Sequence, residues 1–395
     1  MTYTIVVCVL GWLAGWAVMG RPRSVAGLSH DGAGRRGLEG VSVVIPARDE
    51  ERSIAALLTG LCDPQDPTPA PDRIIVVDDH STDRTTEIAA SFPQVEVLSA
   101  PALPERWTGK SWACHVGTSH ARSANADSTG TTENATADQH VPGGAAHVVA
   151  FLDADVRLDR ASLATVVAER DRAGGLVSVQ PWHQTERAYE QLSCLFNVIA
   201  VMGTAIGSQR GATGAFGPVM VTSLADYDAV GGHDAVRSEV VEDLALAERY
   251  RNSGRAVEVL EGGSAIRFRM YPGGIRQLVD GWAKNFATGA GSTRRWRLAA
   301  IVGWVTALGT AAFALDDGLR GELDPLLGVG LYLAFAAQLW WMFRQVGSFG
   351  PLTATLFPIP LVGFIVVFLR SLWLTHVRHA VTWRGRSVST APDRG

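Results

Sequence analysis

Short apolar runs alternate with helical segments in the first half of the chain. The runs cover residues 41–45, 73–77 and 147–152 and are rich in valine and isoleucine, and residues 53–61 between the first two have the spacing of a helix. Strands that alternate with helices indicate βαβ units and a parallel sheet buried on both faces. We therefore expect an α/β fold with a mostly parallel, Rossmann-like sheet.

Carboxylates directly follow two of these runs. The second run continues into Asp78 and Asp79, and the third into Asp153 and Asp155. In an open α/β sheet, ligands bind beyond the carboxyl ends of the strands, so these groups lie where a site is expected. Asp153 and Asp155 suit a divalent cation that also binds substrate phosphates. The alternative is an aspartate-rich turn in which Asp155 caps the next helix.

Further elements follow in the second half of the chain. The pattern predicts a helix over 162–173, a strand over 176–180 and a long helix over 186–207. A glycine-rich segment, 210–218, then leads into a strand at 219–221. Closely spaced glycines allow the backbone to approach a ligand, and they serve a tight turn equally well.

An acidic pair, Glu242 and Asp243, begins an amphipathic helix. The helix dipole favours acidic side chains at this end, which is a sufficient structural explanation. A carboxylate held near a pocket can also act as a general base if partial desolvation raises its pKa. The two interpretations are compatible, and the aspartates at the strand ends favour the functional one.

Both ends of the chain are strongly apolar. Residues 5–19 are almost wholly apolar and are followed by Arg21 and Arg23, without a clear cleavage site, which favours an uncleaved membrane anchor over a signal peptide. Near the C-terminus, residues 298–315, 326–343 and 352–369 approach spanning length. The positive-inside rule then places the middle of the chain in the cytoplasm of a multi-pass protein of the cell membrane.

The last apolar segment contradicts the positive-inside rule if it spans. Three C-terminal spans would place Arg378, Arg384 and Arg386 outside the cell. Pro358 and Pro360 interrupt the segment, so a re-entrant or interfacial helix is the alternative.

The apolar ends define the predicted domains. Residues 123–144 carry almost no large apolar side chain and predict an exposed, flexible insertion. The expected parts are an anchor at 1–20, a linker at 21–40, a soluble domain at 41–297, transmembrane or interfacial helices at 298–374 and a basic tail at 375–395.

Charge and cysteine content exclude several classes of protein. The net charge is −4 without a basic block, so nothing supports a nucleic-acid partner. The four cysteines are widely spaced, which argues against disulfide frameworks and metal–thiolate sites and fits a reducing compartment.

These groups together suit the transfer of a sugar from a nucleotide diphosphate. A metal held by Asp153 and Asp155 would offset the charge that develops on the leaving diphosphate. Asp78 and Asp79 could accept hydrogen bonds from the base and the ribose. Lys110 is the candidate for the phosphates, with a solvent-exposed lysine as the alternative.

The four motifs, in this order, resemble the family 2 glycosyltransferases over about residues 41–297. The matching segments are Val43-Val44-Ile45-Pro46-Ala47-Arg48-Asp49-Glu50, Val76-Val77-Asp78-Asp79-His80-Ser81-Thr82-Asp83, Asp153-Ala154-Asp155 and Glu242-Asp243. The resemblance implies an inverting enzyme with the GT-A fold and a divalent cation, Mg²⁺ or Mn²⁺. It also implies that Pro46 and Glu50 belong to the donor-binding loop and that Asp243 is the catalytic base.

A narrower resemblance concerns the acceptor. The segment Trp107-Thr108-Gly109-Lys110-Ser111-Trp112-Ala113-Cys114 is similar to a loop of carotenoid and hopanoid-associated members, and Gln180-Pro181-Trp182-His183 looks closer to the 4,4'-diaponeurosporenoate glycosyltransferases. That subgroup implies glucose transfer from UDP-glucose to a carotenoid carboxylate. Such an acceptor is already ionised, so Asp243 would orient it or be dispensable, whereas a hydroxyl acceptor would need the base.

Other acceptors and another class stay open. A hopanoid, a polyprenyl phosphate or a glycerolipid would use the same fold and donor site, and a non-catalytic nucleotide-sugar-binding membrane protein is the alternative from another class. The Q-x-x-R-W motif of processive members is missing, which argues against synthesis of a long polymer. The residues expected on the acceptor and membrane side are Glu242, Arg269, Trp282 and Lys284. For the basic and aromatic residues among them, plain membrane anchoring is the alternative.

Overall fold

The computed structural model divides the chain into two compact units. It describes residues 2–28, 37–129, 147–206, 212–239, 241–374, 380–383 and 386–389. The first unit, here called the sheet unit, comprises Arg23–Pro181 and Ala215–Arg267. The second, the helical unit, comprises Met1–Pro22, Trp182–Gly214 and Phe268–Gly395. Segments 182–214 and 268–297, expected in the soluble domain, thus belong with the apolar helices.

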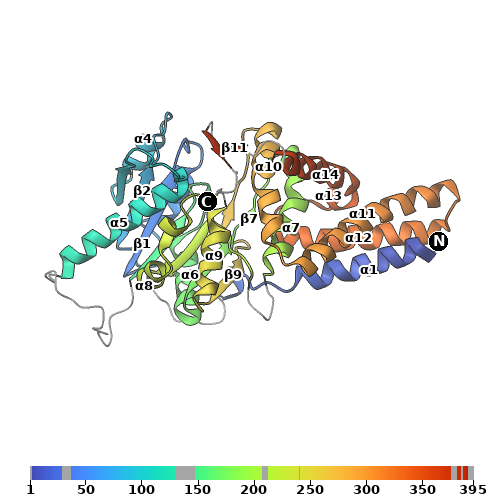
Figure 1. Cartoon of the computed structure of the whole chain (residues 1–395), viewed down its shortest axis with the longest axis horizontal. Helices are drawn as coiled ribbons and strands as arrows, with labels where there is room; N and C mark the ends of the chain where they lie inside the picture. Colours follow the sequence, from blue (N-terminus) through green and yellow to red (C-terminus); the bar gives the residue numbers. More distant parts are fainter. Residues whose placement is uncertain are drawn as a thin grey trace, which may run out of the picture. The chain divides into compact units, whose positions relative to one another are not determined.

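A seven-stranded mixed sheet forms the centre of the sheet unit (Figure 1). In sheet order the strands are β3 (Val95–Ser99), β2 (Arg73–Asp78), β1 (Val41–Ala47), β4 (Val148–Leu152), β8 (Val219–Ser223), β6 (Leu176–Gln180) and β9 (Val257–Glu261). Strand β8 runs antiparallel to both of its neighbours, and the other pairs described are parallel. The carboxyl ends of all strands except β8 therefore share one edge, and the predicted α/β class is confirmed.

Helices cover both faces of this sheet because the strand side chains alternate between two apolar clusters. One cluster joins Val43 and Ile45 to α3 and α6, and the other joins Val44 to α5, α8 and α9. Figure 1 shows α5 running along β1 and β2. The helices of this unit are α2 (Val25–Leu28), α3 (Ile54–Leu61), α4 (Thr85–Ala90), α5 (Gly109–Thr129), α6 (Arg160–Ala173), α8 (Leu224–Ala229) and α9 (Glu242–Asn252), with the 3₁₀ helix η2 (Gly232–Val236).

The structure differs from the sequence prediction in several elements. Strands β3 and β9 were not predicted, and the helix expected over 186–207 is a 3₁₀ turn, η1 (Ala188–Ser193), followed by α7 (Cys194–Thr204). Helix α5 continues to Thr129, through the first seven residues of the predicted insertion, and residues 130–144 lie outside the described part. Short strands β5 (Val156–Arg157), β7 (Trp182–His183), β10 (Arg267–Phe268), β11 (Ala380–Trp383) and β12 (Arg386–Ser389) complete the described strands.

Three helices of the helical unit are long and apolar enough to cross a membrane: α1 (Thr2–Met19), α11 (Arg295–Arg320) and α12 (Pro325–Val346). They lie side by side (Figure 1). Side-chain hydrogen bonds join them, because Trp304 donates to Gln338 at 2.9 Å and Gln338 donates to the carbonyl of Trp12 at 2.8 Å. Polar bonds of this kind stabilise helix pairs where water is absent. The apolar composition and length indicate membrane association.

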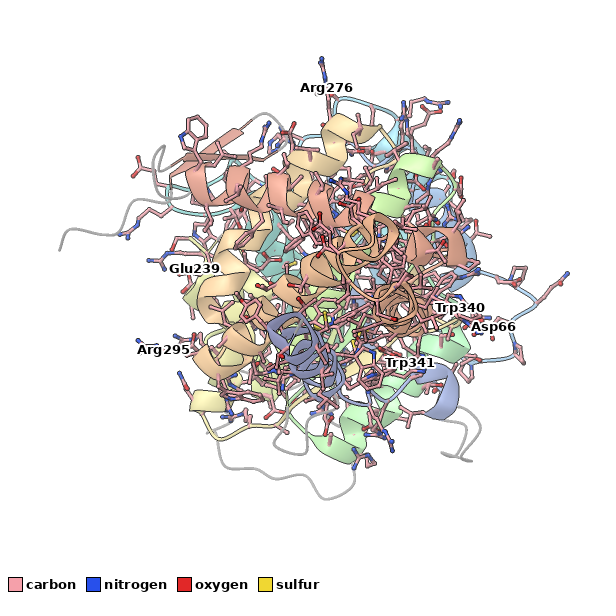
Figure 2. The ribbon with its side chains drawn as sticks, turned by 90° about the vertical axis from the view of Figure 1, so that its right-hand side faces the viewer. Asp66, Glu239, Arg276, Arg295, Trp340 and Trp341 are labelled. Atoms are coloured by element: carbon pink, nitrogen blue, oxygen red, sulfur yellow. The ribbon has the colours of Figure 1, made fainter. Side chains whose placement is uncertain are left out.

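Large apolar side chains remain exposed on these helices. Leu10, Phe313 and Leu333 are each more than half exposed, and Figure 2 labels the exposed neighbours Trp340 and Trp341 on α12. Exposed apolar surface of this extent marks a region that contacts lipid or protein.

The last apolar segment forms two helices, and the break between them lies at the prolines, as the sequence predicted. A short helix, α13 (Pro351–Thr355), precedes α14 (Pro358–Trp373), which has 16 residues. Pro358 is the first residue of α14, where the missing N–H is not needed, and this explains the break. Helix α14 also packs on α10 (Ile275–Ser292), since Ser371 donates to the carbonyl of Ala283 at 2.6 Å.

Candidate functional site

The carboxyl end of β2 carries two buried carboxylates with defined partners. Asp78 accepts hydrogen bonds from the backbone N–H of Ser81 at 3.2 and 3.3 Å. Asp79 is 3.1 Å from the guanidinium of Arg48, which follows β1. Both aspartates are nearly inaccessible to solvent. Arg48 therefore supplies the positive charge that a buried carboxylate requires.

The loops after β1 and β2 are tied to each other. The carboxylate of Asp49 accepts from the N–H of Thr82 at 2.7 Å, and the N–H of Glu50 donates to the hydroxyl of Thr85 at 2.7 Å. The carboxylate of Glu50 accepts from Ser53 at 2.6 Å. Pro46 lies in β1, in register with Val77 of β2. The predicted donor-loop residues are thus held at one edge by cross-loop hydrogen bonds.

Lys110 joins the end of β4 to the start of α9. Its ammonium is 2.8 Å from Oδ1 of Asp153 and 3.0 Å from Oε1 of Glu242. Three motifs that lie far apart in the sequence therefore meet at one cation. Burial alone would lower the pKa of Lys110, but the charges of Asp153, Glu242 and Asp243 outweigh it and raise the pKa well above its usual value.

Asp243 sits next to this cluster with both carboxylate oxygens engaged. Oδ2 accepts from the N–H of Gly217 at 2.7 Å, and Oδ1 accepts from the N–H of Leu244 at 2.8 Å. A Cβ at position 217 would lie 2.8 Å from the Lys110 ammonium and 3.2 Å from Asp243 Oδ2, so a larger residue there would displace the lysine side chain.

Burial raises the pKa of Asp243 to about 7, and the neighbouring charge of Glu242 adds to the rise. Lys110 and the two backbone donors oppose the increase. A carboxylate with a pKa near neutrality can accept a proton from an acceptor hydroxyl at physiological pH. The position and the pKa direction are those expected of a general base.

The comparisons with known proteins agree with this arrangement. A model of the family Glycosyl transferase family 2 matches residues 42–193. The 4,4'-diaponeurosporenoate glycosyltransferase of Staphylococcus aureus (strain USA300) is 33% identical over 362 residues, which cover 90% of this chain and 89% of the relative. The chain belongs to glycosyltransferase family 2. The enzyme of the same name from strain bovine RF122 is 32% identical over the same shares of both chains.

This family 2 glycosyltransferase has a GT-A-like mixed sheet, as the resemblance implied. Among solved structures, a mannosyltransferase from Pyrobaculum calidifontis in complex with GDP-Man and Mn²⁺ gives a TM-score of 0.48. It is 18% identical, over 93% of this chain and 96% of that chain.

The aspartates at the end of β4 offer the donor atoms of a divalent cation site. Asp153 and Asp155 supply carboxylate oxygens, the ligands that Mg²⁺ and Mn²⁺ prefer, and both side chains are partly exposed. Within the described ranges, histidine, cysteine and acidic side chains form no group of three that could hold a metal by itself. The residues fit a cation whose remaining ligands are diphosphate oxygens and water, as is usual for Mg²⁺.

Two residues predicted on the acceptor side have their partners within the helical unit. Arg269 forms ion pairs with Glu186 at 2.6 Å and with Glu190 at 2.7 Å. Trp282 donates to Ser193 at 3.1 Å and is 93% buried. Lys284 lies in α10, and its side chain lies outside the described part. Contact of these residues with an acceptor stays a prediction, because the contacts found connect parts of the helical unit.

Two further residues shape the site, Arg48 and Gly217, and the sequence alone does not reveal their roles. Arg48 lies inside the motif after β1, but its charge pairs with Asp79 only because the β1 and β2 ends are adjacent. Gly217 belongs to the glycine-rich segment, whose role as a turn or a close approach was left open. The contact with Asp243 favours the close approach.

Proposed function

We propose that this family 2 glycosyltransferase transfers glucose from UDP-glucose to a lipophilic acceptor in the membrane, a carotenoid carboxylate such as 4,4'-diaponeurosporenoate. The main support for the proposal is that four charged side chains lie close together at one edge of the sheet: Lys110, Asp153, Glu242 and Asp243. Likeness to the Staphylococcus aureus enzymes over nine-tenths of the chain supports the acceptor class.

The donor would lie along the carboxyl edge of the sheet. Asp78 and Asp79, at the end of β2, would accept hydrogen bonds from the base and the ribose. Lys110 would contact the diphosphate, because its ammonium is held beside Asp153. Asp153 and Asp155 would hold Mg²⁺ or Mn²⁺, which stabilises the negative charge of the departing UDP when it is bound.

The reaction is an inverting displacement. An acceptor oxygen bonds to the anomeric carbon, while the bond from that carbon to the UDP oxygen breaks and UDP leaves with the electron pair. A hydroxyl acceptor loses its proton to Asp243. A carboxylate acceptor brings no proton, so Asp243 then orients it, and Lys110 offsets the accumulated negative charge.

The membrane helices would present the acceptor from the lipid phase to a catalytic unit in the cytoplasm. Arg294, Arg295 and Arg297 lie at or beside the start of α11, and the acidic residues Asp316 and Asp317 lie near its end. By the positive-inside rule this asymmetry supports a cytoplasmic position for the first end.

The raised pKa of Asp243 predicts a pH dependence that differs between acceptor classes. With a hydroxyl acceptor, kcat/KM should fall about tenfold per pH unit below pH 7 and level off above it, because only the ionised form accepts a proton. With a carboxylate acceptor, kcat/KM should show no step near pH 7. Initial rates between pH 5.5 and 9 on both acceptors test this, and a step of equal size for both would contradict the base role.

Lys110→Ala should raise the KM for UDP-glucose by about one to two orders of magnitude, since it removes a charge-assisted contact to the diphosphate. The loss should be smaller for Lys110→Arg, which keeps the charge. Arg276→Ala is a matched control, because Arg276 is exposed on α10 and points away from the ribbon (Figure 2). An unchanged KM in Lys110→Ala would remove this residue from the donor site.

The lipids of cells that contain a carotenoid acid test the proposed function. Mass spectrometry should find a hexosyl ester of that acid when the wild-type chain is expressed, and none with Asp153→Ala. A hexose on a hopanoid, a polyprenyl phosphate or a glycerolipid would keep the reaction class and reject the carotenoid acceptor. The same lipid profile for both proteins would reject the proposal.

A further inference from the structure

Two buried polar side chains end the neighbouring strands β6 and β9 of the sheet unit. Gln180 is 4% exposed and Glu261 is 5% exposed, and the two residues are partners in the parallel register. In the part of the chain that the structure describes, Oε1 of each side chain is buried without a hydrogen-bond partner. Buried acceptor oxygens are nearly always paired, so two at adjacent strand ends point to a bound molecule, water or ligand, that supplies the donors.

Both side chains lie on the face of the sheet that carries α5 and α9. Leu176 of β6 and Val257 of β9 belong to the apolar cluster on that face. Side chains four residues apart in a strand share a face, which places Gln180 with Leu176 and Glu261 with Val257. Phe151 of β4 belongs to the same cluster, and this places Asp153 on the same face by the same rule.

Gln180 is also close in the chain to the backbone that holds Asp243. The hydroxyl of Ser178 accepts from the N–H of Phe216 at 2.7 Å and donates to its carbonyl at 2.8 Å. The next residue, Gly217, donates to Asp243. Gln180 lies two residues beyond Ser178 on the same face, towards the carboxyl edge.

The strand order places this pair on the side of Asp153 that is remote from the nucleotide. Reading from β2, which ends in Asp78, the order is β2, β1, β4, β8, β6 and β9. Neighbouring strands are about 4.8 Å apart, so β6 lies roughly 10 Å from β4. A donor with its nucleoside at β2 and its diphosphate at Asp153 extends its sugar towards β6 and β9.

We propose that Gln180 and Glu261 form a polar subsite that binds hydroxyl groups of the transferred hexose. The inference rests on the proposed function. Hydroxyl groups donate the hydrogen bonds that the two Oε1 atoms lack, and they also accept. Burial raises the pKa of Glu261 to about 8, so at neutral pH its carboxyl is uncharged and can donate as well as accept. A neutral pair suits an uncharged sugar better than a phosphate or a carboxylate.

Affinities of the full-length protein in lipid nanodiscs for UDP and for UDP-glucose, with Mg²⁺ present, test this subsite. Gln180→Leu and Glu261→Met should bind UDP-glucose about tenfold more weakly and bind UDP unchanged, because each loses a hydrogen bond to the sugar alone. Glu261→Gln, which keeps a donor and an acceptor, should stay within about twofold of wild type. Glu258→Gln, a partly exposed position on the same strand, is the matched control and should change nothing.

Thermal stability separates ligand binding from a structural role. Replacing an Oε1 atom that has no protein hydrogen bond by an apolar group of similar size removes no such bond, so neither apolar variant should lower Tm. Three results for the apolar variants would each overturn the subsite. They are an equal loss of affinity for UDP and UDP-glucose, a change in the acceptor KM alone, and an unchanged affinity for UDP-glucose. A wild-type protein that binds neither UDP nor UDP-glucose would instead overturn the proposed function.

Discussion

Asp243→Asn is expected to slow sugar transfer to a hydroxyl acceptor by about 10²- to 10⁴-fold, the usual contribution of a general base. Transfer to a carboxylate acceptor should fall far less, since no proton has to be removed. UDP affinity should stay within about twofold of wild type, because the proposed role of Asp243 concerns the acceptor and not the donor. The ratio of the two rate losses therefore reports the acceptor chemistry directly.

The hydrogen bonds of the Asp243 carboxylate determine which controls the Asp243→Asn variant needs. Both carboxylate oxygens accept backbone hydrogen bonds, whereas asparagine offers only one acceptor oxygen, so Tm must be measured beside the rates. Glu248→Gln neutralises an exposed acid on the same helix and should leave rates unchanged. Wild-type turnover of a hydroxyl acceptor by Asp243→Asn would reject the base assignment.

Asp155→Ala is expected to remove the dependence of donor binding on a divalent cation. Wild-type protein should bind UDP more tightly with Mn²⁺ than with EDTA, and the variant should show the weaker affinity in both. Loss of the cation removes several kcal/mol of charge stabilisation from the departing diphosphate, so turnover should fall at least about 10²-fold.

Asp155 is the better position for this test because Asp153 also pairs with Lys110. Substituting Asp153 would confound loss of the cation with release of the lysine. Glu87→Ala, at an exposed position of α4, controls for the loss of one negative charge. Equal UDP affinity with and without Mn²⁺ in the wild-type protein would show that these aspartates hold no cation.

The predictable part of the fold is the part encoded by local patterns. Strands β1, β2, β4 and β6 are short, mostly apolar runs, and the carboxylates of Asp78, Asp79 and Asp153 lie directly at the ends of β2 and β4 in the sequence. Strand β9 alternates Val and Glu and was missed, since an edge strand carries a weaker apolar signal. The antiparallel direction of β8 depends on pairing with β4 and β6, which periodicity does not encode.

The sequence predicts which residues belong to the candidate site, but it does not predict the contacts between them. Motif spacing selected Lys110, Asp153, Glu242 and Asp243, but their meeting at one ammonium depends on the tertiary fold. The unpaired oxygens of Gln180 and Glu261 could not be predicted at all, because burial without a partner is a property of the folded chain. Arg269 pairs with Glu190 in the structure, a contact that its basic charge near an apolar helix does not reveal in the sequence.

The proposed sugar transfer can be measured in membranes that contain this protein, as movement of label from UDP-[¹⁴C]glucose to a carotenoid acid. Label should appear in a lipid-soluble, alkali-labile ester with the wild-type chain and be absent from that ester with Asp155→Ala. Label in no lipid, with wild-type membranes equal to those containing Asp155→Ala, would contradict it.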